Sequence, residues 1–247
     1  ASEGDNAELA NALTRLGQVL HRHGSNDRAM KKFEEAHEMV RRLYGDDSEH
    51  VAMVCNAMAA TLKNQGRIAE SIAMQEKACD IIRRTQGSDS DNFASFVCNL
   101  GYLYAEKRMF AEALARFEEG LSIVRRNHPE RNATEGMMLA NIGNVYGMQD
   151  KHEDALGMYK KALRIFRKTL GPESVEASNA QHLIGTALSK QGKMDEALEM
   201  YEGALGIRRR ALGDEHERVV EVLVHMGECK EVAGDVGGAI ECFREAQ

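Results

Sequence analysis

The chain has 247 residues, of which 43% are hydrophobic and 29% are charged, and its formal net charge is −7. This composition favours a soluble globular protein over a disordered one, and the negative charge argues against a general nucleic-acid binder, which needs clustered lysine and arginine to neutralise phosphates. No stretch approaches the roughly 20 consecutive apolar residues that span a bilayer, so no membrane contact is expected.

The cysteines and the first residues indicate where the protein works. The five cysteines are irregularly spaced and form no C-x-x-C pair, which suits reduced thiols better than a disulfide framework. The opening residues, ASEGDNAELA, are acidic and polar, unlike a secretory signal. We therefore expect a cytoplasmic location.

Turn signals divide the chain into six repeats. Glycine or proline stands beside Asp, Ser, His or Glu at 44–48, 86–90, 127–129, 170–173 and 212–215, as expected where one helix stops and the next begins. Within a repeat, apolar residues recur at helical spacing on both sides of a short polar break. The sequence predicts an all-α chain with two antiparallel helices per repeat, about twelve in all, forming one solenoid. The repeats lie at about 10–51, 52–93, 94–135, 136–177, 178–219 and 220–247, the last of which is truncated.

Small residues recur every 42 residues in three columns. The columns are Gly17, Ala59, Gly101, Gly143, Gly185 and Gly227; then Ala29, Ser71, Ala113, Ala155, Ala197 and Ala239; then Ala36, Ala78, Gly120, Ala162, Ala204 and Ala246. An aromatic column runs beside them: Phe33, Gln75, Phe117, Tyr159, Tyr201 and Phe243. A period of this length is the sequence signature of a repeat architecture.

The columns have a physical reason. Helices approach closely, to about 8 Å, only where the side chains at the crossing are small. A large side chain at Gly143 or Ala155 is expected to cost about 1–3 kcal/mol through overpacking. The aromatic residue is expected to fill the wedge between neighbouring hairpins. Ser71 and Gln75 depart from their columns and are expected to weaken the packing of the second repeat.

These columns resemble the tetratricopeptide repeat, which has a small residue at position 8, Ala at 20, an aromatic residue at 24 and Ala at 27. The commonest form has 34 residues. The 42-residue spacing, with linkers such as LGPESVEAS and LGDEHERVV, looks like the kinesin-light-chain type. The resemblance implies a right-handed α-solenoid (superhelix) of six helix-turn-helix units, whose first helices line a concave groove.

Motifs for catalysis or for cofactor binding are missing from the sequence. There is no Gly-rich phosphate loop, G-x-S-x-G, H-E-x-x-H or EF-hand loop. His21 and His23 point apart on a helix, so they cannot share a metal. His182 and His225 stand at neighbouring positions on successive first helices, and we expect two exposed groove histidines. The sequence therefore predicts no enzyme, no cofactor and no metal.

The expected groove is rich in asparagine, a mediocre helix former whose amide both donates and accepts hydrogen bonds. Such side chains suit the backbone of an extended peptide. The resemblance implies this role for Asn99 and Asn141, which match the asparagine that peptide-binding members carry at position 6. The predicted groove residues are Arg15, Gln18, Arg22, Asn56, Lys63, Asn99, Tyr102, Asn141, Asn144, Asn179 and His182.

Charge is distributed unevenly along this groove. Arg15, Arg22 and Lys63 fall in the first repeats, whereas Glu221 and Glu228 fall in the last. We expect a protein or peptide partner with an acidic segment and one apolar anchor, which kinesin-light-chain relatives bind and the resemblance implies here. Tyr102, with Met53 and Ala57, is expected to border an apolar pocket.

The predicted function is that of a non-enzymatic adaptor that binds an extended peptide in its concave groove, by resemblance a cargo adaptor of the kinesin-light-chain type. Two alternatives stay open. One is a structural scaffold subunit that uses its convex face or its termini. The other is a module that self-associates through an exposed C-terminal helix, since the sequence ends after Ala246 without a polar cap. From that ending we expect the natural protein to continue.

Overall fold

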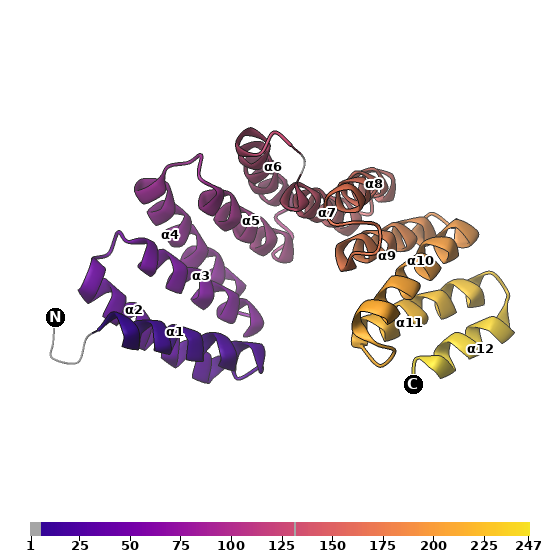
Figure 1. The fold of residues 1–247 in the computed structure, drawn as a ribbon, viewed down its shortest axis with the longest axis horizontal. Helices are drawn as coiled ribbons and strands as arrows, with labels where there is room; N and C mark the ends of the chain where they lie inside the picture. The colour runs from indigo at the N-terminus through magenta and orange to yellow at the C-terminus, as the bar shows by residue number, and fades with distance from the viewer. Residues whose placement is uncertain (1–5, 131) are drawn as a thin grey trace. The chain divides into compact units, whose positions relative to one another are not determined.

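The computed structural model describes residues 6–130 and 132–247, which form twelve α-helices and no strand (Figure 1). The all-α fold of helix-turn-helix repeats is confirmed. First helices begin at 42-residue intervals, and so do second helices. The helices are α1 (Ala7–Arg22), α2 (Asn26–Tyr44), α3 (Glu49–Asn64), α4 (Ile68–Gln86), α5 (Asp91–Glu106), α6 (Phe110–Asn127), α7 (Ala133–Met148), α8 (His152–Thr169), α9 (Val175–Lys190), α10 (Met194–Leu212), α11 (Glu217–Val232) and α12 (Val236–Glu245).

The helices group into two units, each of three hairpins. The first unit, Ala1–Asn127, contains α1 to α6, and the second, His128–Gln247, contains α7 to α12. Within each unit the two helices of a hairpin pack on each other, and each second helix packs on the first helix of the next hairpin. Each unit is therefore a short stack of hairpins whose core runs between successive pairs.

The small and aromatic columns meet inside every hairpin except the second. A Cβ atom added to Gly17 would lie 2.6 Å from the ring of Phe33, and one added to Gly185 would lie 2.7 Å from the ring of Tyr201. The ring thus occupies the space that a side chain on the first helix would need. The ring of Tyr201 also stacks on His225 of the next hairpin, with centroids 5.9 Å apart, as the predicted wedge requires.

Polar side chains cap the first helices in the same 42-residue register. The N-cap side chain accepts a hydrogen bond from a backbone N–H in the first turn of each first helix. A capping side chain of this kind contributes about 1 kcal/mol, so the helix starts are fixed locally. These caps are Asn6, Ser48, Ser90, Asn132, Ser174 and His216.

Ion pairs also link successive repeats. Arg84 on α4 pairs with Asp47 at 2.6 Å, Arg126 on α6 pairs with Asp89 at 2.5 Å, and Arg210 pairs with Glu173. All of these side chains are exposed, and pairs of this kind contribute about 0–1 kcal/mol each. They help to set the register of neighbouring hairpins, while burial of the apolar columns supplies most of the stability.

Candidate functional site on the first helices of the first unit

The candidate site is the surface formed by α1, α3 and α5 of the first unit, called here the first-helix face. The rest of each first helix is committed to packing: α3, for example, buries Val51, Val54, Met58 and Leu62. Polar and mixed side chains are left on the remaining stripe. They are Gln18, Arg22, Asn56, Lys63, Asn99 and Tyr102, which are all exposed or half-buried.

A hollow of about 400 Å³ lies between α1 and α3. His21 of α1 and Thr61 of α3 connect the two helices, since Nδ1 of the histidine lies 3.2 Å from the threonine hydroxyl. Burial, followed by the charge of Lys63, lowers the pKa of His21 below its ordinary value. The basic side chain in the lining is therefore that of Arg22. The lining residues are Gln18, His21, Arg22, Phe33, Asn56, Ala57 and Ala60.

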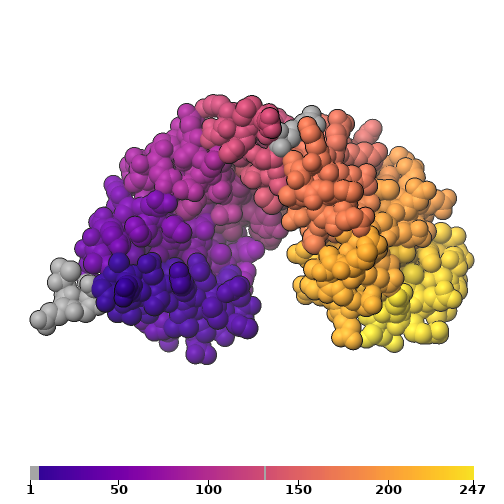
Figure 2. All heavy atoms as spheres, in the orientation of Figure 1, coloured from indigo at the N-terminus to yellow at the C-terminus, as the bar shows by residue number. Residues whose placement is uncertain are grey.

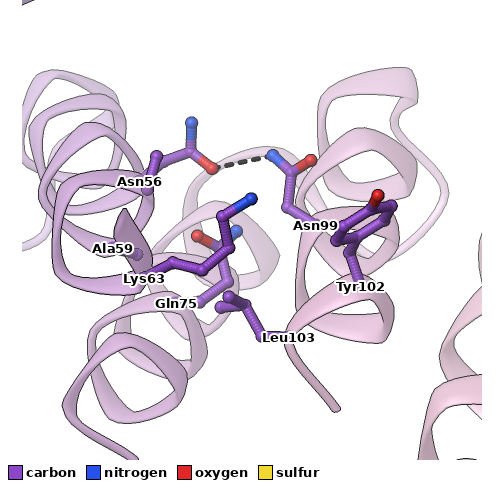
Figure 3. A pocket seen from close by; sticks show the side chains of 8 residues that line it. Asn56, Ala59, Lys63, Gln75, Asn99, Tyr102 and Leu103 are labelled. Carbon is purple, nitrogen blue, oxygen red and sulfur yellow. Dashed lines mark hydrogen bonds between the residues drawn. The ribbon is translucent and has the colours of Figure 1, made fainter. Parts of the chain in front are cut away.

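A second, smaller pocket of about 150 Å³ lies between α3 and α5. Figure 3 shows Gln75 and Lys63 reaching into the space between these helices, with Tyr102 at its side. Asn56 and Ala60 line both hollows, so the two adjoin. The lining residues are Asn56, Ala59, Ala60, Lys63, Gln75, Asn99, Tyr102 and Leu103.

This pocket coincides with the break in the aromatic column. Gln75 stands at the register where every other hairpin has a ring, and Ala59 stands where every other hairpin has glycine. The two changes belong together, because an added Cβ at the glycine positions would collide with the ring. Gln75 is 1% exposed and donates from Nε2 to the backbone oxygen of Phe96 at 3.0 Å. The second hairpin therefore replaces a ring with a hydrogen-bonded amide and leaves open space beside it.

Two asparagines form the polar rim of the pocket. Asn99 donates from Nδ2 to Oδ1 of Asn56 at 2.8 Å, which bridges α5 and α3 (Figure 3). Lys63 lies with its ammonium 5.4 Å from the centroid of the Tyr102 ring, a cation–π contact. The rim thus offers amide groups, an ammonium and an aromatic ring that is 44% exposed.

The other predicted residues are placed differently. Arg15 is exposed on α1 but lines neither hollow. Asn141, Asn144, Asn179 and His182 belong to the second unit. Asn144 accepts a hydrogen bond from the Tyr159 hydroxyl at 2.8 Å, and Asn179 accepts one from Arg208 at 3.1 Å. These two amides are therefore already engaged by the fold.

In the second unit, the register that forms the pocket in the first unit is filled by side chains. Nε2 of His182 lies 2.8 Å from Nδ1 of His225, and the Tyr201 ring packs against both imidazoles. The expectation of two exposed histidines is wrong for His182, which is 6% exposed. Burial and the positive charge of Arg208 lower the pKa of His182 to about 4. This site is packed rather than open.

Arg208 explains why sequence reasoning misplaced His182. It extends from α10, is 2% exposed, and donates to the Arg218 backbone oxygen at 2.6 Å and to Glu221 at 3.0 Å. Inner-surface positions predicted for the first helices do not include this side chain, because it comes from a second helix. The available signal was the 42-residue register, because Arg208 stands where the earlier repeats have the apolar residues Val40, Ile82, Val124 and Phe166.

The described residues show neither a metal-binding cluster nor a membrane-spanning helix. Across residues 6–130 and 132–247, no cluster of three or more His, Cys, Asp or Glu side chains is placed to hold a metal ion. No helix in the same residues is long and apolar enough to cross a membrane.

Solved structures share this fold. BtubC (BKLC) from P. vanneervenii aligns with a TM-score of 0.78 and 21% identity, over 90% of this chain and 89% of that one. The nearly identical repeats of a putative kinesin light chain from Podosopora anserina align with a TM-score of 0.69 and 16% identity, over 81% and 94%. RapI in its apo form aligns with a TM-score of 0.72 and 15% identity, over 99% and 84%. At these identities the likeness establishes the fold.

Sequence comparison identifies the family. No curated protein matches the chain. The model of the tetratricopeptide repeat matches residues 8–84, 52–126, 133–209 and 176–247, which together cover nearly the whole chain. Members of this family are generally protein-interaction modules. With its hairpins, its small and aromatic columns and this match, the chain belongs to the tetratricopeptide repeat family.

Proposed function

We propose that the protein is a non-enzymatic cytoplasmic adaptor that binds an extended acidic peptide on the first-helix face, with one apolar side chain of the peptide in the pocket beside Gln75. The observation that carries the proposal is this pocket, which lies in the first unit where Gln75 replaces the aromatic ring of the repeat. A ring or a large aliphatic group from a partner would restore the missing packing and gain about 1.5–3 kcal/mol on burial.

The rim of the pocket supports a peptide as the occupant. Asn56 and Asn99 hold amide groups at the pocket mouth, and an amide pairs with the N–H and C=O groups of an extended backbone regardless of its sequence. The hydrogen bond between them keeps these polar groups satisfied while the site is empty. A bound backbone exchanges that bond for two new ones.

The charge of the first-helix face supports an acidic segment. Arg22 and Lys63 line the two adjoining hollows, and Arg15 is exposed on the same helix as Arg22. These side chains attract carboxylates and steer the peptide, mainly through the association rate and the orientation. The contribution is screened by salt, because the groups are at the surface.

Structural relatives support the same class of function. Two of the solved structures are described in their names as BKLC and as a putative kinesin light chain. The proposed role is accordingly that of a cargo adaptor of the kinesin-light-chain type. The alternative, a structural scaffold subunit, would use the convex face or the termini, so it does not depend on the pocket beside Gln75.

The decisive experiment fills the pocket without adding charge. The variant Ala59→Gly with Gln75→Phe recreates the glycine–ring pair of the other five hairpins. We expect it to fold at least as stably as the parent protein and to lose affinity for a labelled acidic peptide with one aromatic anchor at least tenfold, by fluorescence polarisation. Undiminished binding would contradict the assignment of the pocket.

Two further variants test the polar and basic groups. Asn56→Ala combined with Asn99→Ala, and separately Arg15→Glu, are expected to weaken micromolar peptide binding while helicity is unchanged. Arg28→Glu is the matched control for Arg15→Glu. Arg28 is exposed on α2 of the same hairpin, and its substitution changes the net charge by the same amount. If Arg15→Glu and Arg28→Glu weakened binding equally, the effect of Arg15 would come from the net charge of the protein and not from its place on the first-helix face.

A further inference from the structure

A hollow of about 290 Å³ lies in the second unit, where it is lined by the end of α8, the linker that follows it, α9 and α10. Figure 2 draws residues 167–210, which contain the whole lining, in shades of orange. The first-helix face belongs to the first unit, so a ligand of this hollow is independent of the proposed peptide site. The hollow is called here the Arg167 pocket, and its lining includes Arg167, Pro172, Gln181, Gly203, Gly206 and Arg210.

Two glycines of α10 make room for the Arg167 pocket. Gly203 and Gly206 stand at registers where the earlier second helices carry polar or charged side chains. A glycine inside a helix costs about 0.5–1 kcal/mol relative to alanine, so helix stability does not account for the pair. The side chains at the two registers are Glu35, Lys77, Glu119 and Lys161, and then Glu38, Asp80, Ser122 and Arg164.

Gly206 also removes a carboxylate from the neighbourhood of Arg210. In the first repeat the equivalent arginine, Arg42, pairs at 3.8 Å with Glu38, which stands at the register of Gly206. Nη1 of Arg210 lies only 3.4 Å from the place of a Cβ atom on Gly206. Its Nη2 donates to Glu173. One side of this guanidinium group therefore lies over a position that has lost its acidic side chain.

Pro172 removes a carboxylate from the neighbourhood of Arg167 in the same way. It stands at a register where the first and fifth repeats have an aspartate, and in both of them that aspartate pairs with the arginine equivalent to Arg167. Two changes at separate registers thus take acidic groups away from one pocket, while both arginines are kept. The equivalent pairs are Arg41 with Asp46, and Arg209 with Asp214 at 3.3 Å.

A buried amide completes the lining. Gln181 is 7% exposed, and its Oε1 has no hydrogen-bond partner in the structure. The amide lies against α10, since a Cβ atom on Gly203 would stand 2.6 Å from its Nε2. The residues at this register one repeat before and after are Leu139 and Leu223, so packing does not require an amide here. A buried polar group that the fold neither needs nor satisfies points to a group supplied from outside.

We propose that the Arg167 pocket binds a glutamate or aspartate side chain of a protein partner, whose carboxylate replaces the acidic groups that the fourth and fifth repeats lack. Arg167 and Nη1 of Arg210 donate to the carboxylate oxygens through charged hydrogen bonds. The Gln181 amide pairs with a polar group of the partner's backbone. Glu173 and Glu202 also line the pocket, and their negative charge favours a singly charged carboxylate over a doubly charged phosphate.

The test uses the full chain labelled with ¹⁵N and the probe N-acetylglutamate N-methylamide, whose one charged group is a side-chain carboxylate. We expect saturable shifts of the Gly203 and Gly206 amide resonances, with a dissociation constant on the order of 1 mM for a ligand of this size. The glutamine analogue of the probe differs only in charge and is expected not to bind. Equal binding of the two probes, or no saturable shift with either, would overturn the proposal.

Two further probes separate the sources of an anion. N-acetylalanine carries a chain-terminal carboxylate, and inorganic phosphate carries a doubly charged group. Both are expected to bind more weakly than the glutamate probe. Tighter binding of N-acetylalanine would assign the pocket to a chain terminus, and tighter binding of phosphate would assign it to a phosphorylated group. Either result would contradict the proposed side-chain ligand.

Variants at Gly206 test the replacement of the missing carboxylate. Gly206→Glu restores the acidic group of Glu38 and is expected to weaken the glutamate probe about tenfold or more. Gly206→Gln adds the same bulk without the charge, and Ser122→Glu adds the charge at the equivalent exposed position of α6; both are expected to change affinity by less than about threefold. An equal loss in Gly206→Glu and in either control would overturn the proposal.

The Gly206 variants are expected to remain folded. The nearest group to an added Cβ atom is the flexible end of Arg210, and glycine is a poor helix former. Urea denaturation checks that their stability is at least that of the parent protein. Gly206→Glu is also expected to bind the labelled acidic peptide of the first-helix face like the parent, so the two sites are tested separately.

Discussion

The ring of Tyr159 lies so close to Gly143 that a Cβ atom on the glycine would stand 2.6 Å from Cε1 of the tyrosine. Atoms do not pack at that distance, so Gly143→Ala must displace either the ring or the helix. We expect the free energy of unfolding to fall by about 1–3 kcal/mol, measured by urea denaturation.

Gly147 provides the matched control one turn further along the same helix. A Cβ atom there would lie 3.6 Å from the Tyr159 hydroxyl, an ordinary contact. Gly147→Ala is therefore expected to leave stability unchanged or to raise it by up to about 1 kcal/mol, because alanine favours the helix. If both substitutions had the same effect, the ring contact would not be what requires glycine at 143.

Replacing Gln181 by leucine is expected to stabilise the protein. Its Oε1 is buried without a hydrogen-bond partner in the structure, although the residue lies in a core column whose members one repeat before and after are Leu139 and Leu223. A buried unsatisfied polar atom costs about 1–3 kcal/mol. The measurement is the shift in the thermal midpoint. Gln18→Leu, at an exposed site, serves as the control, and its expected effect is within about 0.5 kcal/mol.

Stability is expected to depend on pH through His182. Its pKa in the folded state is about 4, below its ordinary value of 6.5, so the unfolded chain binds the proton first as the pH falls. The stability that the neutral imidazole contributes is therefore complete above pH 6.5 and is lost progressively as the pH falls towards 4. Arg208, Glu221 and His225 surround it and set this order of protonation.

The variant His182→Gln isolates that contribution. Between pH 6.5 and 4, its urea midpoint is expected to fall less steeply than that of the parent protein. Parallel curves for the two proteins would show that another group dominates the acid sensitivity.

Cys79 and Cys98 are expected to be poorly reactive in the folded state. Burial raises the pKa of Cys79 and of Cys98 to about 12. At pH 8 the thiolate fraction of such a group is roughly a thousandfold below that of a thiol of ordinary pKa. Alkylation monitored by mass spectrometry should be slow for these two residues, and denaturant should accelerate it strongly. Rapid modification without denaturant would mean that the hairpins open frequently.

The repeat architecture could be predicted from sequence because its cause is local and periodic. A small residue such as Gly17 and a ring such as Phe33 recur at one spacing, and each pair makes one hairpin contact. The helix starts follow from caps such as Ser48 and Ser90, which use the same period. The linker glycines are recognisable as stop signals from the sequence alone, whereas this column of caps is not, because its members Asn, Ser and His share a function and not a chemical type.

The candidate site could be predicted only in part, because it depends on contacts between repeats. The sequence shows that Gln75 departs from the aromatic column and predicts weaker packing there. Its hydrogen bond to the backbone of Phe96 and the open space beside it depend on the folded arrangement of two hairpins, which the sequence does not give. Likewise, the pairing of Asn56 with Asn99 joins two helices that are separated by a whole hairpin in sequence. A position on the predicted groove did not distinguish these amides from that of Asn144, whose side-chain oxygen accepts a hydrogen bond from the Tyr159 hydroxyl.

Within each unit, the main helix contacts join only helices that are one or two places apart along the chain. Local unfolding therefore does not require contacts between distant segments to break at the same time. A terminal hairpin such as α11–α12 can unfold by losing only its contacts with α10 and α9. Amide hydrogens in α12 should exchange with deuterated water sooner than those in α10, because α10 has neighbours on both sides. A surface at the edge of such an array is dynamic, whereas a pocket between interior hairpins keeps its shape.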